Sequence, residues 1–158
     1  MGNAMKVFVS YSTAMDHIVA LRLQTLAAVY GLTVYVPPAT TRRVATPELS
    51  DEVQQKLNES DVVLVVMMHD PAVSAVSEMN WALVKGRLLI PIVSPLVSQQ
   101  YYTRFQPYFV LNPTDPSQTE GEIVRFLAGK KQAQQAKTAL LALATLALGL
   151  ILFSSESE

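Results

Sequence analysis

One run of apolar residues constrains the fold more than any other feature of the sequence. Residues 61–68 read DVVLVVMM, an aspartate followed by uninterrupted apolar side chains. A strand that is apolar on both faces is typical of the centre of a parallel sheet, because helices cover both faces of such a sheet. Shorter strand-like runs, rich in β-branched, aromatic and leucine side chains, lie at residues 6–12, 32–36, 88–93 and 108–111. The sequence therefore predicts a parallel sheet of about five strands.

Helical patterns separate these strands. Apolar residues recur at helical spacing over residues 18–30, 48–60, 74–85 and 117–128. Asp16 is expected to cap the first of these helices, and Gly31 and Gly86 follow helices at the position where a left-handed residue ends them. Strands that alternate with helices form right-handed βαβ units. We therefore expect an α/β fold, with a flavodoxin-like, doubly wound parallel sheet and a C-terminal hydrophobic helix.

The composition excludes several classes of protein. Of 158 residues, 50% are hydrophobic and 16% are charged, so the chain can bury enough surface to fold. The net charge of −1 provides no basic field for nucleic acid, and nucleic acid is not expected as a partner. The absence of cysteine excludes disulfides and thiolate metal sites, and no metal is expected. A reducing, intracellular compartment fits these features, and the first residues carry no targeting signal.

The C-terminal end holds most of the apolar excess. Residues 139–153 read ALLALATLALGLILF and carry no charge. Fifteen residues of helix span roughly 22 Å, whereas a bilayer core is about 30 Å thick. Lysines before the run and glutamates after it orient the preceding domain toward the cytoplasm, with anchoring in the inner membrane. The alternative is a helix buried against its own domain or in an oligomer interface. We expect a domain at 1–128 and a helix at 129–158 with its apolar segment at 138–153.

The carboxyl ends of the predicted strands indicate where a ligand binds, because ligands of doubly wound sheets bind at that edge. These ends are residues 10–12, 36–38, 68–71 and 94. The hydroxyl groups of Ser10, Tyr11 and Ser12 could bind a ribose or a phosphate at this edge, or could be satisfied within the strand end. No glycine-rich loop follows the first strand, so a P-loop or a dinucleotide-binding turn is not expected.

The order of these pieces resembles the TIR domain family over roughly residues 5–128. The resemblance is carried by the opening VFVSYS, a proline-containing loop after the second strand, LNESDVVLVVMM, a serine-rich approach to Glu78, and LLIPIV. It implies a flavodoxin-like sheet and self-association through TIR–TIR contacts. It also implies hydrolysis or cyclisation of NAD⁺ with release of nicotinamide, by an antiviral (anti-phage) effector that assembly activates.

The resemblance makes Glu78 the essential carboxylate of this NAD⁺ nucleosidase. Nicotinamide leaves as a neutral group, so one anion beside the ribose could stabilise the oxocarbenium-like transition state without a general acid. Arg42 and Arg43 are expected to contact the pyrophosphate or a neighbouring subunit, and Trp81 the substrate. NAD⁺ would be the substrate, with no bound cofactor. Ordinary alternatives are a solvated glutamate, surface arginines and a core tryptophan.

Two other functions are compatible with the sequence. A non-catalytic TIR interaction module is favoured by Ser74, which stands where the family often has an aromatic residue four positions before the glutamate. A nucleoside deoxyribosyltransferase-like enzyme shares the sheet architecture and uses a glutamate nucleophile.

Overall fold

The computed structural model describes residues 5–38, 50–112 and 114–156, and for residues 74, 138 and 145–156 it describes the backbone alone. The strands are β1 (Lys6–Ser10), β2 (Thr33–Tyr35), β3 (Val62–Met67), β4 (Leu88–Val93) and β5 (Phe109–Val110). The helices are α1 (Ala14–Val29), α2 (Asp51–Glu59), α3 (Val73–Val84), the short 3₁₀ helix η2 (Gln99–Tyr101) and α4 (Pro116–Glu156). The predicted alternation of strands and helices is confirmed.

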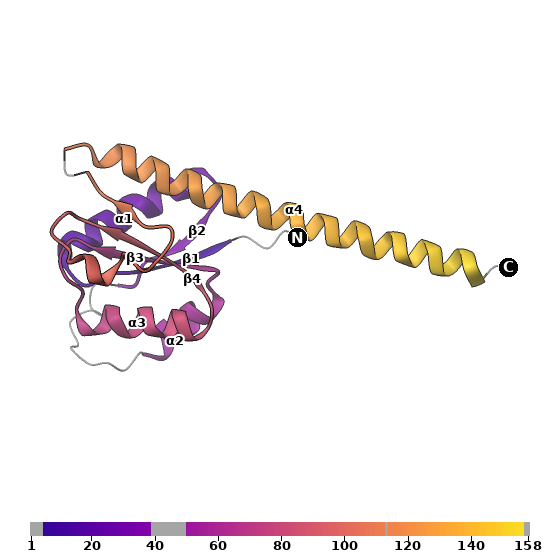
Figure 1. Ribbon diagram of the computed structural model, residues 1–158, viewed down its shortest axis with the longest axis horizontal. Helices are drawn as coiled ribbons and strands as arrows, with labels where there is room; N and C mark the ends of the chain where they lie inside the picture. Colours follow the sequence, from indigo (N-terminus) through magenta and orange to yellow (C-terminus); the bar gives the residue numbers. More distant parts are fainter. Residues whose placement is uncertain (1–4, 39–49, 113, 157–158) are drawn as a thin grey trace.

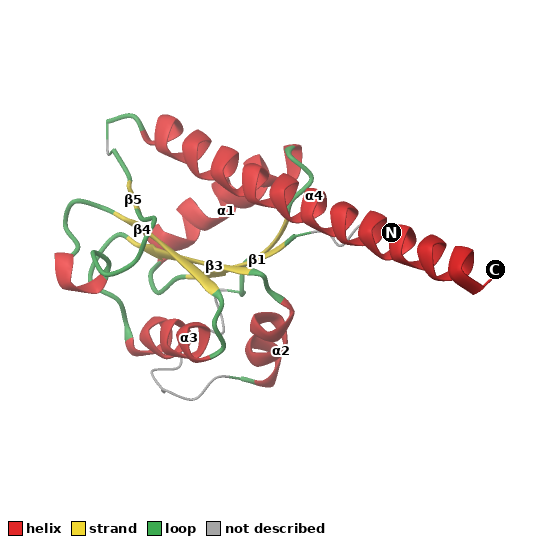
Figure 2. Cartoon of the chain, turned by 45° about the vertical axis from the view of Figure 1, so that its right-hand side comes forward, coloured by secondary structure: helices red, strands yellow, loops and turns green. Residues whose placement is uncertain are grey.

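All five strands are parallel and lie in the order β2-β1-β3-β4-β5. This is the order of flavodoxin-like sheets, in which the direction of winding reverses next to the first strand. Helices α1 and α4 lie on one face of the sheet, and α2 and α3 lie on the other (Figures 1 and 2). β3 is buried at every position, as its sequence predicts for a central strand.

Each face of the sheet packs its own hydrophobic cluster. Val9, Leu64 and Ile92 belong to the cluster under α1 and α4, which also contains Leu23 and Ile123. The alternate residues of the same strands belong to the second cluster under α2 and α3, which contains Phe8, Val65, Leu57, Met79 and Phe105. Successive side chains of a strand point to opposite faces, so the continuous apolar sequence of β3 contributes to both clusters.

The two glycines predicted to follow helices are confirmed, and the predicted N-cap of α1 is corrected. Gly31 and Gly86 have φ values of 72° and 68° and follow α1 and α3 as predicted. The amides of Leu32 and Arg87 close the turns by donating to carbonyl groups five residues earlier. Asp16 is not the N-cap of α1: Thr13 is the N-cap, and Asp16 completes a capping box from the third helical position.

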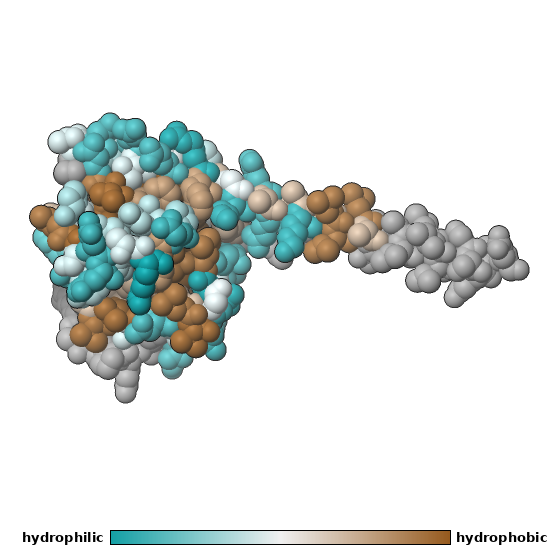
Figure 3. Space-filling view, viewed as in Figure 1, coloured by the Kyte–Doolittle hydropathy of each residue, from teal (hydrophilic) through white to brown (hydrophobic). Residues whose placement is uncertain are grey.

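α4 is one helix of 41 residues, and the predicted domain boundary at residue 128 falls inside it. Ile123, Val124 and Leu127 are buried against the sheet, whereas Leu140 and Leu141 are 67% and 60% exposed. The helix projects away from the domain, and its exposed leucines follow a hydrophilic band along the projecting part (Figures 1 and 3).

The prediction of a membrane anchor at 138–153 is corrected. Within the part of the chain that the structure describes, no helix is long and apolar enough to cross a bilayer. The side chains of residues 138 and 145–153, which are ten of the sixteen residues of the predicted segment, lie outside that part.

Candidate ligand-binding site

The structure brings Ser10 and Glu78 together at the end of β1. Ser10 Oγ donates a hydrogen bond of 2.6 Å to Glu78 Oε1, and both residues are 0% exposed. Helix α3 positions Glu78, because Ala75, Met79 and Ala82 bury the same side of this helix against the sheet. A buried polar group needs a hydrogen-bond partner, and the Ser10 hydroxyl supplies one to Glu78. Ser10 and Glu78 are therefore hydrogen-bonded to each other inside the domain, away from solvent.

Tyr11 and Ser12 follow Ser10 and bind groups of the backbone. Tyr11 is buried, donates from its hydroxyl to the Pro37 carbonyl and stacks on His17 with ring centroids 4.7 Å apart. The Ser12 hydroxyl accepts a hydrogen bond of 3.3 Å from the Ala72 amide, which joins the turn after β1 to the start of α3. These contacts give both hydroxyls a structural partner.

Trp81 has a structural place on α3. Trp81 packs at the margin of the cluster under α2 and α3, with Lys85 Nζ 5.8 Å from the centre of its ring. Arg42 and Arg43 lie outside the described residues.

Asp16 closes the first strand-to-helix turn with three hydrogen bonds. Its Oδ2 accepts from the amides of Ser12 and Thr13, both at 3.0 Å, and its Oδ1 accepts from the Met68 amide at 2.9 Å. The carboxylate is 2% exposed and occupies the position where backbone amides could otherwise hold an anion. The first turn therefore binds its own aspartate through the amides of Ser12 and Thr13, and these two amides are not open to a ligand phosphate.

A pocket of about 560 Å³ opens beside this turn, at the carboxyl ends of three strands. Met68 and His69 follow β3, Ser94 follows β4 and Leu111 follows β5, so the sheet supplies one side of the pocket. The apolar wall comes mainly from Met15, Ile18, Val19, Leu96 and Leu111. We name this space the carboxyl-edge pocket.

Arg22 and Glu120 form a bidentate ion pair in the wall of the pocket. Arg22 Nε donates to Glu120 Oε2 and Arg22 Nη2 donates to Glu120 Oε1, both at 2.9 Å. Glu120 is 1% exposed, whereas the Arg22 side chain is 53% exposed. The pair joins α1 to α4, and its guanidinium stays open to solvent on one side.

A second hollow of about 550 Å³ lies on the other side of the same pair. Ile18, Arg22 and Glu120 line both spaces, and Leu21, Leu26 and Gly121 line only the second. The groove between α1 and α4 therefore has two hollows with one ion pair between them.

The polar groups of the carboxyl-edge pocket are fixed by the loops that carry them. Ser94 Oγ donates to the Met68 carbonyl at 2.6 Å, which ties the end of β4 to the end of β3. Asp70 accepts from the amide and the hydroxyl of Ser98 at 2.9 and 3.1 Å, and so holds the turn that contains His69. Among the described residues, no group of three or more histidine or acidic side chains is placed to hold a metal ion.

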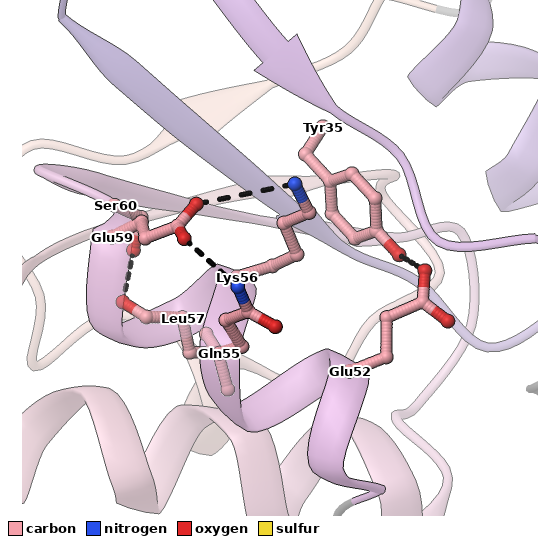
Figure 4. Close-up of polar contacts among 7 residues, drawn as sticks. All are labelled: Tyr35, Glu52, Gln55, Lys56, Leu57, Glu59 and Ser60. Carbon is pink, nitrogen blue, oxygen red and sulfur yellow. Dashed lines mark hydrogen bonds and ion pairs between the residues drawn. The ribbon is translucent and has the colours of Figure 1, made fainter.

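A further group of polar side chains lies on α2 and has the character of an ordinary surface. Figure 4 shows Tyr35 donating to Glu52 Oε1, at 2.9 Å, and Lys56 reaching Glu59, at 3.9 Å. Lys56 and Glu59 are 40% and 38% exposed, and exposed pairs of this kind contribute about 0–1 kcal/mol. We do not assign a site to this group.

The sequence indicated part of the carboxyl-edge pocket. The turn residues 68–71 and Ser94 were expected at the ligand-binding edge, and His69 and Ser94 do line the pocket. No pattern in the sequence pointed to Arg22 and Glu120, because they are 98 positions apart. Only the packing of α1 on α4 brings them together.

Comparisons with known proteins give a fold neighbour and no family. No family model matches the chain, and no curated protein matches it. A solved structure that does match is the sugar isomerase domain of the RpiR transcription factor from Sphaerobacter thermophilus. The two chains are 16% identical with a TM-score of 0.52, and the match covers 91% of this chain and 79% of the other. At this identity the likeness shows the fold alone.

These findings correct the functional predictions that depended on the TIR resemblance. The match is to a sugar isomerase domain of a transcription factor, and nothing in the comparisons supports a TIR domain, an NAD⁺ nucleosidase or an antiviral effector. The predicted TIR–TIR homo-oligomer, the TIR interaction module and the deoxyribosyltransferase-like enzyme are corrected with them. The resemblance misled because strand-end serines, a buried valine-rich strand and a capping glycine are features that parallel α/β sheets share.

Proposed function

We propose that this chain is a ligand-binding domain that takes a small molecule into the carboxyl-edge pocket. The observation that carries the proposal is the position of this pocket at the carboxyl ends of β3, β4 and β5. Its volume of about 560 Å³ falls in the range of roughly 300–1,000 Å³ that is usual for ligand sites. Ligands of open parallel sheets bind at this edge.

The lining defines the chemistry of the ligand. Ile18, Leu96 and Leu111 offer apolar contact to the body of a ligand, and Leu96 is 72% exposed without one. His69 provides hydrogen-bonding groups at the sheet side of the pocket, whereas the Ser94 hydroxyl donates to the Met68 carbonyl and keeps only acceptor capacity for a ligand. A compact molecule with an apolar body and a few polar atoms fits this lining best.

A sugar is the second candidate. The fold neighbour is described as a sugar isomerase domain, and His69, Ser94 and Arg22 together could bind hydroxyl groups. A phosphate on such a sugar could not use the amides of Ser12 and Thr13, because Asp16 occupies them.

The test uses two probes and two matched variants of the full chain. N-phenyl-1-naphthylamine, a neutral apolar fluorophore, reports the pocket by fluorescence, and glucose 6-phosphate is tested by calorimetry. Ile18→Glu places a charge in the pocket wall, and Val84→Glu places the same charge on α3, where the side chain is 83% exposed. We expect saturable binding that Ile18→Glu weakens at least tenfold and Val84→Glu leaves unchanged.

The two candidates give different results. Pocket-dependent binding of the fluorophore supports the apolar ligand, and pocket-dependent binding of glucose 6-phosphate supports the sugar. Binding that both variants weaken equally, or no saturable binding of either probe, refutes the proposed function.

A further inference from the structure

The ion pair between Arg22 and Glu120 defines the ligand more closely. Arg22 has five N–H donors, and its two bonds to Glu120 leave three N–H groups for other acceptors. The Arg22 side chain is 53% exposed and lines both hollows of the groove between α1 and α4. The guanidinium is therefore held in place and presents donors to whatever fills the groove.

Holding the guanidinium in place favours binding. Glu120 is 1% exposed, so it needs its cation, and the bidentate geometry fixes both the position and the plane of Arg22. A ligand that binds a fixed side chain loses less conformational entropy than one that must order a mobile side chain.

The charges and the walls of the groove together specify the head and the body of the ligand. Glu120 is the acidic side chain in the lining of the pocket, and it already receives two bonds from Arg22. Ile18 lies beside Arg22 in both hollows, and Met15, Leu21 and Leu26 extend the apolar surface along α1. An anionic head at Arg22 would have apolar wall on either side of it.

We propose that the ligand is an amphipathic organic acid, whose anionic head binds Arg22 and whose apolar body lies in the hollows between α1 and α4. This inference rests on the proposed function and adds the charge of the ligand to it. The head accepts hydrogen bonds from the Nη groups that Glu120 leaves open, as carboxylates and sulfonates do with guanidinium groups.

Two fluorophores with the same ring system test the proposal. 8-Anilinonaphthalene-1-sulfonate carries one sulfonate, and N-phenyl-1-naphthylamine is the same body without it. We expect the wild-type chain to bind the sulfonate at least tenfold more tightly than the neutral probe, and sodium decanoate to displace it at lower concentration than 1-decanol.

Variants of Arg22 test the contribution of its charge separately from that of the apolar walls. Arg22→Gln alone would leave Glu120 buried without its cation and could unfold the chain, so Arg22→Met/Glu120→Leu replaces both charges by apolar side chains of similar length. This double variant is expected to bind the neutral probe at least as tightly as the wild type and to lose the tenfold preference for the sulfonate. Arg22→Lys keeps the charge, loses the fork and is expected to retain part of the preference.

The outcomes distinguish this inference from the proposed function. If the wild type binds both fluorophores equally, and Ile18→Glu weakens both, the pocket is a ligand site and the anionic head is refuted. A sulfonate preference that persists in the double variant also refutes the role of Arg22. If neither fluorophore binds in a way that Ile18→Glu weakens, the proposed function itself fails.

Discussion

Replacing Asp16 by asparagine tests how the first strand-to-helix turn is held. The carboxylate uses both of its oxygens, one for the amides of Ser12 and Thr13 and the other for the amide of Met68. Asparagine has one oxygen to accept with, and its amino group would face an N–H donor at the other position. The variant therefore changes few atoms and removes at least one of the three hydrogen bonds.

The expected loss of stability follows from these contacts. A hydrogen bond to a charged group contributes about 1.5–3 kcal/mol, and a buried donor left without a partner costs about 1–3 kcal/mol. Asp16 is 2% exposed, so water does not replace the missing acceptor. We expect Asp16→Asn to lower the free energy of unfolding by about 2–4 kcal/mol. In a chain of 158 residues this corresponds to a fall in Tm of about 4–16 °C.

Urea unfolding followed by circular dichroism measures the effect. Asp70→Asn is the matched control, because Asp70 also accepts two hydrogen bonds but is exposed, and we expect it to change the free energy of unfolding by about 0.5 kcal/mol or less. A free energy of unfolding for Asp16→Asn within about 0.5 kcal/mol of the wild type, or an equal loss in Asp70→Asn, would refute this role of Asp16.

Three further variants probe other parts of the fold by the same unfolding assay. Ser10→Ala should lower the free energy of unfolding by about 1.5–3 kcal/mol, because it removes the hydroxyl donor to the fully buried Glu78; an unchanged midpoint would contradict the importance of this bond. Gly31→Ala and Gly86→Ala should each cost about 1–2 kcal/mol, because both glycines have positive φ; a neutral result at either position would show that the turn relaxes. Leu140→Gln should stay within about 0.5 kcal/mol of the wild type, because the side chain is 67% exposed; a larger loss would show that this part of α4 packs against something.

The order of strands and helices could be predicted because it depends on local patterns. The apolar run of β3, the helical spacing between strands and the glycines at 31 and 86 each report a short-range preference of the backbone. The N-cap of α1 was predicted three residues too far along the chain. Aspartate often caps helices, but here Thr13 is the N-cap and Asp16 completes its capping box. An aspartate can occupy either the N-cap or the third helical position, and these two positions are three residues apart.

Less of the candidate site than of the fold could be predicted from the sequence. Edge positions such as Ser94 follow from the topology, because the carboxyl ends of parallel strands meet at one edge. The ion pair of Arg22 and Glu120 depends on how two helices pack on the sheet, and no periodicity encodes that contact. The functional role predicted for Glu78 depended on the family resemblance, and its complete burial beside Ser10 could be known only from the packing of α3.

The continuity of α4 has a mechanical consequence. The same helix lines the pocket with Pro116 and Glu120 at one end and reaches Glu156 at the other, so a rigid tilt of α4 at the pocket would be carried to its far end. At 1.5 Å per residue, the 36 positions from Glu120 to Glu156 span about 54 Å, and a tilt of about 5° at the pocket would displace the far end by about 5 Å. A ligand that pushes α4 away from α1 would therefore displace the C-terminal end of α4, far from the pocket.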